Sequence, residues 1–425
     1  MTYQRRNRLP RQTLRDLCLK GDLIDPSKTP DHNFEYIDVS AVSGDQLAII
    51  GTTHHTGESA PSRARKRVRD GDVLFATIRP TLKRVAVVPK SLDGNIASTA
   101  FCILRADPAK IDNRFLYYAV CSDGFADSIA SLQRGVSYPA VTDSDVLAQE
   151  IPVPSMADQK AISAALSRVQ RSVELEDERL RTLAEMKVAA IARVFSEGLR
   201  GAGSSDSEYG RVPSGWTTIR LRDCADIQTG ITKGRSVPES EGVELPYLRV
   251  ANVQDGYLDL SVVKSIQIRR SEIPRFSLRV GDVLLTEGGD FDKLGRGYIW
   301  KGEIEPCVHQ NHVFAVRTDR LRLLPGYFAY LAQSPYGKRY FLTVAHKTTN
   351  LACINSTKLG EFPVLLPSID EQRGIAELLS AIDQRIEASR QRRSTLHALF
   401  RAALNEMISG DVVVDAADVI SADYA

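Results

Sequence analysis

Basic side chains gather ahead of two similar Gly-Asp-Val segments, which begin at Gly71 and Gly281. The first group holds five cations in seven residues, Arg63, Arg65, Lys66, Arg67 and Arg69, and the second holds Arg269, Arg270 and Arg275. Because DNA affinity depends on lysine and arginine neutralising phosphates, cations at matched places indicate a surface that follows a phosphate backbone. We therefore predict phosphate contacts for four side chains of the first group: Arg63, Arg65, Lys66 and Arg67. The alternative is that these cations are solvated loop charges.

Further side chains that could hydrogen-bond to base edges lie in or beside the same loops. Arginine on guanine and asparagine on adenine are the geometrically favoured pairings. The candidates for reading bases are Arg79, Lys83, Arg84, Lys233, Arg235, Arg249, Asn252, Lys293 and Arg296. Together with the phosphate candidates and with Arg269 and Arg270, they form the predicted DNA-binding set.

The common catalytic signatures are missing from the sequence. It contains no GxxxxGK[ST], HExxH or GxSxG motif, and the glycine-rich stretch from Glu287 to Gly297 carries two aspartates that would repel a phosphate. His309 and His312 have no matching ligand cluster and are expected to be surface or hydrogen-bonding groups. The six cysteines occur singly and are expected to be buried free thiols. We therefore predict a binding protein with no catalytic or metal site and no cofactor of its own.

An internal repeat organises the chain. The segment from Pro154 to Ile162 aligns with the segment from Pro367 to Ile375 at an offset of 213 residues, with Asp158-Gln159 matching Glu371-Gln372. The two Gly-Asp-Val segments match at an offset of 210. The chain is thus two copies of one unit, and each copy ends in a helical segment.

The helical segments carry apolar residues at the alternating three- and four-residue spacing of a coiled-coil seam. The first seam comprises Ile162, Leu166, Val169, Val173, Leu180, Leu183, Ala190 and Val194, with polar interruptions at Glu176 and Lys187. The second comprises Ile375, Leu379, Ile382, Ile386, Leu396, Phe400, Ala403 and Met407, with interruptions at Ser389 and Arg393. Since each helix has one apolar stripe to bury, we predict that the two pack against each other antiparallel.

The remaining sequence reads as short strands with helices at Asn113–Cys121 and Pro325–Gln333. The predicted fold class is α+β, with two mixed α/β domains in tandem repeat and two long helices packed as an antiparallel coiled coil. The predicted boundaries are residues 1–154 for the first domain, 155–200 for the first spacer helix, 201–210 for a flexible linker, 211–367 for the second domain, 368–410 for the second spacer helix and 411–425 for a tail.

Composition is that of an ordinary globular protein. The 425 residues are 25% charged and 43% hydrophobic, and the formal net charge is +2. The longest apolar stretches fall well short of the roughly 20 residues that cross a bilayer, and the basic N-terminus is not followed by the apolar core of a secretory signal. We expect a cytoplasmic protein that does not contact a membrane.

These motifs resemble the specificity subunits of type I restriction–modification systems. The resemblance rests on Pro246–Val253, on Gly281–Leu284, on the doubled helix-start motif at Pro154–Ile162 and Pro367–Ile375, and on Arg181–Lys187. It implies two target-recognition domains that read a bipartite DNA target, two short half-sites with an unspecified spacer, without catalysing a reaction. The implied partners are double-stranded DNA, two DNA methyltransferase (M) subunits and restriction/motor (R) subunits. S-adenosylmethionine, ATP and Mg²⁺ would then belong to those partner subunits.

Two other functions stay open at this stage. One is a nuclease whose site is unrecognised, and the other is a repeat adaptor that binds only proteins. Cleavage of DNA with Mg²⁺ by the pure protein would favour the first. A lack of salt-dependent DNA affinity would favour the second.

Overall fold

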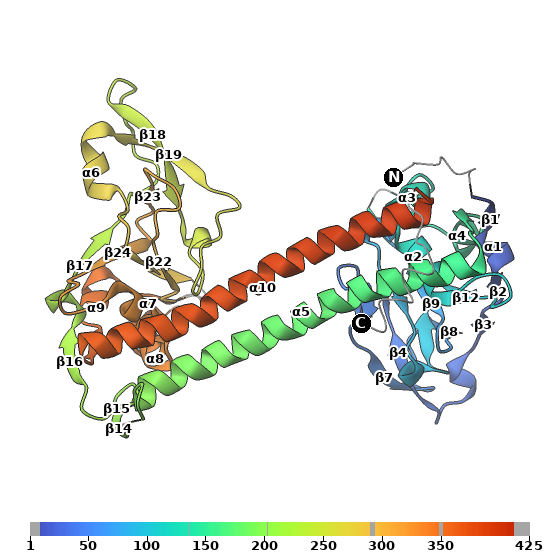
Figure 1. The fold of residues 1–425 in the computed structure, drawn as a ribbon, viewed down its shortest axis with the longest axis horizontal. Helices are drawn as coiled ribbons and strands as arrows, with labels where there is room; N and C mark the ends of the chain where they lie inside the picture. Colours follow the sequence, from blue (N-terminus) through green and yellow to red (C-terminus); the bar gives the residue numbers. More distant parts are fainter. Residues whose placement is uncertain (1–8, 136, 202, 290–293, 348–351, 412–425) are drawn as a thin grey trace. The chain divides into compact units, whose positions relative to one another are not determined.

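The computed structural model describes residues 9–135, 137–201, 203–289, 294–347 and 352–411 (Figure 1). The chain divides into two compact units. Unit 1 takes the residues up to Asp177 and those from Arg392 onward, and unit 2 takes Glu178–Gln391. Each unit contains one sheet-rich domain together with part of α5 (Met156–Glu197) and part of α10 (Ile369–Ser409).

Unit 1 is built around a four-stranded sheet of order β10-β9-β12-β2 and a five-stranded sheet of order β3-β8-β11-β4-β7. Its strands are β1 (Arg11–Thr13), β2 (Cys18–Leu19), β3 (Asp22–Leu23), β4 (Asn33–Ile37), β5 (Val42–Ser43), β6 (Ala48–Ile49), β7 (Thr53–Thr56), β8 (Ala64–Arg67), β9 (Val73–Ala76), β10 (Val85–Val87), β11 (Ile96–Ser98), β12 (Phe101–Ala106) and β13 (Glu150–Pro152). Its short helices are α1 (Leu14–Leu17), α2 (Asn113–Cys121), α3 (Asp123–Ala130) and α4 (Asp143–Leu147).

Unit 2 has a four-stranded sheet of order β17-β24-β20-β22 and three-stranded sheets of order β19-β18-β23 and β21-β26-β25. Its strands are β14 (Ser204–Ser207), β15 (Gly210–Pro213), β16 (Thr217–Arg220), β17 (Ala225–Thr229), β18 (Gly242–Leu248), β19 (Lys264–Arg269), β20 (Val283–Thr286), β21 (Gly288–Gly289), β22 (Gly297–Ile299), β23 (Val308–His309), β24 (Val313–Thr318), β25 (His346–Lys347), β26 (Ala352–Cys353) and β27 (Pro363–Leu366). Its short helices are α6 (Ile273–Phe276), α7 (Pro325–Gln333), α8 (Pro335–Val344) and α9 (Ser356–Gly360).

The sequence repeat is a repeat of structure. A fully buried strand follows each Gly-Asp segment, β9 in unit 1 and β20 in unit 2, and each is flanked by an antiparallel partner, β12 or β24. The predicted helices at Asn113–Cys121 and Pro325–Gln333 are confirmed as α2 and α7. The predicted α+β class with two tandem domains and two long helices is also confirmed.

The two long helices pack against each other within each unit. In unit 1, Leu166 of α5 shares a buried cluster with Phe400 of α10. In unit 2, Lys187 of α5 pairs with Asp383 at 2.6 Å, and the backbone N–H of Leu199, just after α5, donates to Glu371 at 3.2 Å. In these contacts, residues with higher numbers in α5 meet residues with lower numbers in α10, so the predicted antiparallel packing is confirmed.

Details of the second seam differ from the prediction. Leu404 and Ile408 are buried, whereas Ala403 and Met407 are only partly buried. A straight α-helix has 3.6 residues per turn, so a stripe counted at the coiled-coil spacing drifts away from the interface along a long helix. Two of the polar residues that interrupt the seams have partners on the other helix. Glu176 accepts a hydrogen bond from Arg392 at 3.1 Å, and Arg393 pairs with Asp177.

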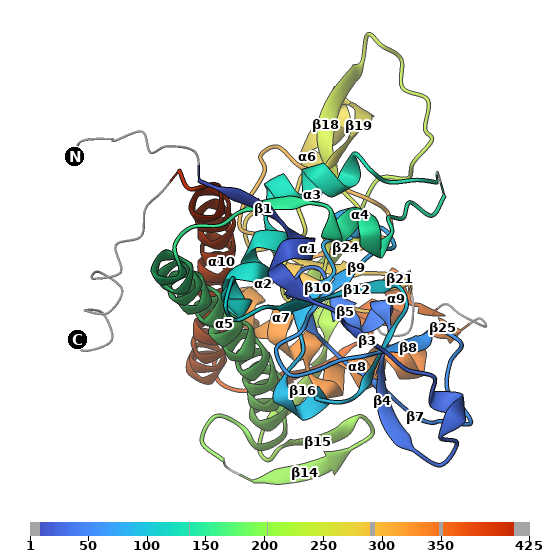
Figure 2. The same ribbon diagram turned by 90° about the vertical axis from the view of Figure 1, so that its right-hand side faces the viewer.

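The expected flexible linker contains ordered structure. Strands β14 and β15 pair antiparallel as a hairpin that follows α5 (Figure 2). Tyr209, at its turn, packs its ring against those of Tyr336 and Tyr340, with centroids 5.8 and 5.2 Å apart. One aromatic side chain thus anchors a stretch whose small polar composition predicted flexibility. None of the described helices is long and apolar enough to cross a membrane.

Candidate nucleic-acid interface

Three cations of the first group, Arg63, Arg65 and Arg67, lie at alternate positions in and next to β8 and therefore share one face of the strand. Successive side chains of a strand point to opposite sides, and Arg63 and Arg67 are exposed while Arg65 is half-buried. Lys66 points the other way, is 9% exposed, and donates to the carbonyl of Phe101 and to the carboxylate of Asp143. The predicted phosphate contact of Lys66 is therefore wrong, because its ammonium is committed inside the domain.

The base-reading candidates of unit 1 surround a 3₁₀ turn at Pro80–Leu82, after β9. Lys83 pairs with Asp123 and lowers the pKa of that carboxyl below its ordinary value. Arg84 donates to the carbonyl of Val39 at 3.1 Å. Arg79 is exposed, and its guanidinium lies over the ring of Tyr138. The turn therefore brings three of the predicted residues together at one edge of the domain.

In unit 2 the exposed candidates lie near the β18–β19 hairpin and α6. Lys233 and Arg270 are exposed. Arg235 pairs with Glu272 and lowers the pKa of that carboxyl, and Arg269 pairs with Glu241 at 3.2 Å. These ion pairs are at the surface, where exchange for a DNA phosphate costs little.

Asn252 is not available to read a base. It is 2% exposed; its carbonyl oxygen accepts from the N–H of Arg249 at 2.9 Å, and its amide nitrogen donates to the carbonyls of Asp259 and Val262. A buried amide with these partners holds a turn, so this predicted role is wrong. Arg249 donates to Val262 at 3.2 Å and Arg296 to Gln254 at 2.9 Å. Lys293 lies outside the described residues.

The Gly-Asp-Val segments serve a structural purpose that the sequence did not reveal. Asp72 is 2% exposed and accepts two bonds from Arg105 of β12, both at 2.8 Å. Asp282 is equally buried and accepts from Arg317 of β24 at 2.9 and 3.1 Å. Each aspartate also accepts the backbone N–H three residues before it. A paired arginine at matching places in both copies, 33 and 35 residues later, was the available signal.

Each helix-start motif fixes a long helix to its domain through a buried glutamine. Gln159 accepts the N–H of Asp112, the N-cap residue of α2, at 2.7 Å, and donates to the carbonyl of Pro154. Gln372 accepts the N–H of Leu324, the N-cap of α7, at 2.9 Å, and donates to Arg322 and Pro367. The same contact in both units sets how the helix meets the sheet domain.

The histidines are hydrogen-bonding or surface groups, as predicted, whereas the prediction of buried cysteines is partly corrected. His309 is fully buried and hydrogen-bonds to the carbonyl of Val313 at 2.7 Å, whereas His312 pairs with Glu287 at the surface. All six cysteines are free; four are buried, but Cys18 is partly exposed and Cys353 is exposed. In the part of the chain that the structure describes, no group of three or more histidine, cysteine and acidic side chains could hold a metal ion.

His309 makes the stability of unit 2 sensitive to pH. Burial lowers its pKa from 6.5 to about 4, so between these values the unfolded chain binds a proton that the folded unit does not. Stability contributed by the neutral imidazole is complete above pH 6.5, and up to about 3 kcal/mol is lost as the pH falls to 4. Denaturation of His309→Gln across this range should show a flatter pH dependence, whereas His346→Gln, at an exposed position, should retain the parental slope.

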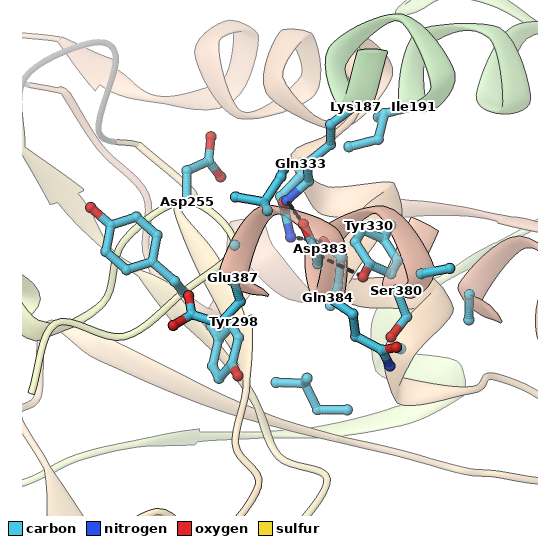
Figure 3. A pocket seen from close by; sticks show the side chains of 18 of the residues that line it. Lys187, Ile191, Asp255, Tyr298, Tyr330, Gln333, Ser380, Asp383, Gln384 and Glu387 are labelled. Atoms are coloured by element: carbon cyan, nitrogen blue, oxygen red, sulfur yellow. Dashed lines mark hydrogen bonds and ion pairs between the residues drawn. The ribbon is translucent and has the colours of Figure 1, made fainter. Parts of the chain in front are cut away.

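A groove of about 1300 Å³ lies in unit 2 between α5, α7 and α10 (Figure 3). At its wall, Lys187 pairs with Asp383, which also accepts the hydroxyl of Tyr330 at 2.7 Å. Desolvation and the adjacent Asp383 carboxylate raise the pKa of Tyr330. Apolar side chains from α5, including the exposed Val188, line the same groove. No pattern in the sequence indicates this groove, because it depends on how three helices pack.

Comparison with known proteins bears on both units. Residues 13–185 and 213–398 each match the family model described as the type I restriction modification DNA specificity domain. The chain belongs to this family. The two matches correspond to the two copies of the repeat, so the family's domain is present twice.

Relatives in this family include two specificity subunits. The type I restriction enzyme MjaVIII specificity subunit of Methanocaldococcus jannaschii is 25% identical over 328 residues, 75% of each protein. The EcoKI specificity subunit of Escherichia coli (strain K12) is 24% identical over 294 residues, 67% of this chain and 61% of that protein. Another Methanocaldococcus jannaschii relative is 24% identical, and the match spans about half of its length, 48%.

A solved structure matches nearly the whole chain. It is described as "Structural basis underlying complex assembly and conformational transition of the type I R-M system", and it superposes with a TM-score of 0.61 at 29% identity. The match covers 97% of this chain and 100% of the other.

Proposed function

We propose that this protein is the noncatalytic DNA-recognition subunit of a type I restriction–modification complex. The observation that carries the proposal is that one DNA specificity domain occurs twice on a shared scaffold with different exposed side chains. Unit 1 presents Arg63, Arg67 and Arg79, whereas unit 2 presents Lys233 and Arg270. Two domains of the same fold that expose different side chains suit a target made of two different half-sites separated by unread base pairs.

The partners in this proposal are double-stranded DNA, two methyltransferase subunits and the restriction/motor subunits. The groove of unit 2 is a candidate docking surface for a methyltransferase subunit, because Val188 of α5, which lines it, is exposed and apolar. S-adenosylmethionine, ATP and Mg²⁺ would be bound by the partners, and the complex would act on DNA in the cytoplasm.

The direct test is co-expression with the methyltransferase subunit of the same system, followed by methylation-site sequencing of host DNA. We expect adenine methylation at one bipartite motif, and none when this chain is omitted. Incubating the pure chain with DNA and Mg²⁺ tests the nuclease alternative, for which cleavage would be decisive. Absence of salt-dependent DNA binding by the assembled complex would favour the protein-only adaptor.

Arg63, Arg65 and Arg67, at alternate positions in and next to β8, are expected to follow the phosphate backbone. Replacing Arg63, Arg65 and Arg67 together by alanine should weaken DNA binding by the complex and reduce the slope of log K against log salt by about 2.7, since each phosphate contact contributes about 0.9. Base preference should persist, because phosphate contacts carry no sequence information. Titrations at several salt concentrations give the slope.

A control variant removes the same charge elsewhere in unit 1, by replacing Lys20, Lys90 and Lys110 with alanine. These side chains are exposed and lie outside β8. Equal salt slopes for the arginine variant and this control would contradict the assignment. Lys66→Ala is a separate experiment, because its buried ammonium predicts a loss of folding stability rather than of phosphate binding.

A further inference from the structure

Arg79 occupies a backbone position that favours glycine. Its φ and ψ are 48° and 54°, in the left-handed region, although it precedes a proline, a setting that favours extended backbone. The same position in the second copy, 210 residues later, is Gly289, whose φ is also positive at 149°. Unit 1 thus places a long cationic side chain where unit 2 has none. Strain of this kind persists where the surrounding structure enforces it and often marks a functional site.

The surrounding loop holds Arg79 in place through the backbone. The N–H of Arg79 donates to the carbonyl of Pro139 at 2.7 Å, and the N–H of Val141 donates to Thr77 at 2.9 Å. Arg134 and Ala140 exchange two backbone hydrogen bonds of 3.0 Å and close a tight loop. Inside it, a Cβ on Gly135 would lie 3.1 Å from the carbonyl oxygen of Tyr138. These backbone contacts hold Arg79 beside the segment that carries Tyr138.

The side chains of this pair stack at the surface. The guanidinium carbon of Arg79 lies 5.3 Å from the ring centroid of Tyr138, and that tyrosine is 73% exposed. Two neighbouring cations have carboxylate partners, since Lys83 pairs with Asp123 and Arg134 pairs with Asp145. For Arg79, which is exposed, the ring of Tyr138 is the side-chain partner that the described residues provide.

A stacked guanidinium is suited to reading a base. An aromatic ring holds the planar group by its face and leaves the N–H donors at its edge free, and this fork matches the O6 and N7 acceptors of guanine in the major groove. Holding the side chain in advance also lowers the entropy lost on binding. A lysine at this position would supply the same charge, but its ammonium lacks the two parallel N–H donors with which a guanidinium binds guanine.

We propose that Arg79, held by Tyr138, reads one guanine in the half-site that unit 1 recognises. Tyr138 acts as a positioning residue, and the left-handed backbone of Arg79 is retained because it directs the guanidinium outward. The inference rests on the proposed function and adds the base that is read, the side chain that reads it and the side chain that positions the reader.

Methylation-site sequencing with the methyltransferase complex tests the assignment. Arg79→Lys should relax the preference for guanine at a single position of one half-site by about fivefold or more, the loss of one bidentate base contact, and should leave the other half-site unchanged. Tyr138→Leu should relax the same position, whereas Tyr138→Phe should behave as the parent because it retains the ring. Arg134→Lys, in the same loop but paired with Asp145, is the matched control and should not alter that position.

Arg79→Gly separates base reading from a structural role. Glycine adopts a positive φ without strain, so this variant should lose the guanine preference while its melting temperature stays the same or rises. A lower melting temperature with unchanged base preference would overturn the proposal. So would a general loss of methylation by Tyr138→Leu without a change in preference, which would indicate a wedge between base pairs.

The two proposals fail in distinguishable ways. A parent complex that methylates no bipartite motif removes the proposed function and this inference with it. A parent motif that both Arg79 variants reproduce unchanged, or one without guanine in either half-site, removes only the role of Arg79.

Discussion

Replacing Asp72 with alanine is expected to destabilise unit 1 by up to about 3 kcal/mol, the lower end of the usual cost of breaking a buried ion pair from one side, because Asp22 remains 3.1 Å from Arg105. The substitution leaves the guanidinium of Arg105, whose side chain is 12% exposed, without its bidentate partner. It also removes the acceptor for the N–H of Arg69. Hydrogen exchange measured by mass spectrometry should show faster exchange in β9 and β12. A local measurement is needed because a chain of two units need not unfold in one step.

Asp70→Ala is the matched control, since it removes an exposed carboxylate two residues away. Its exchange rates should stay close to those of the parent. The double variant Asp72→Leu with Arg105→Met should recover much of the lost stability, because replacing both charges with apolar groups avoids an unpaired buried ion. Equal protection of β9 in Asp72→Ala and in the parent would contradict this account. The same test applies in unit 2 to Asp282 and Arg317.

This ion pair illustrates what the sequence could not provide. The Gly-Asp-Val segments were visible as a repeat, and their strands and the helices α2 and α7 were predicted from local pattern. The arginine partners occur in both copies, but only the pairing of β9 with β12, and of β20 with β24, indicates that they meet the aspartates. A repeat therefore predicted where elements occur better than it predicted which polar side chains hold them together.

In the candidate interface, residue type alone did not indicate which polar side chains are exposed. Lys66 and Asn252 were chosen by residue type, and both are buried with internal partners. For Lys66 a local signal existed, since it lies on the same face of β8 as the buried Ala64. For Asn252 there was none, because an asparagine that fixes a turn and one that reads adenine look alike in sequence. The stacking of Arg79 on Tyr138 was equally invisible, since it depends on a loop closing beside β9.

The long helices were the most predictable elements, because their apolar period persists over about ten turns. Leu166 of α5 is fully buried in the cluster that includes Phe400 of α10. Leu166→Asp is expected to cost unit 1 at least about 4 kcal/mol, since it removes a buried leucine and places a carboxylate among apolar side chains. In unit 2, Ile382→Asp should act in the same way within the cluster that includes Leu183. Exchange rates should rise first in the unit that carries the substitution.

Each helix provides its own control, about two and a half turns away in α5 and about one turn away in α10. Leu175 of α5 and Leu378 of α10 are 49% and 43% exposed, so aspartate at either position should change stability by no more than about 0.5 kcal/mol. Since both half-sites must be read for a bipartite target, either buried substitution should also abolish methylation by the complex, whereas both controls should retain it. If Leu166→Asp matched Leu175→Asp in exchange and in methylation, the seam between α5 and α10 would not be what holds unit 1 together.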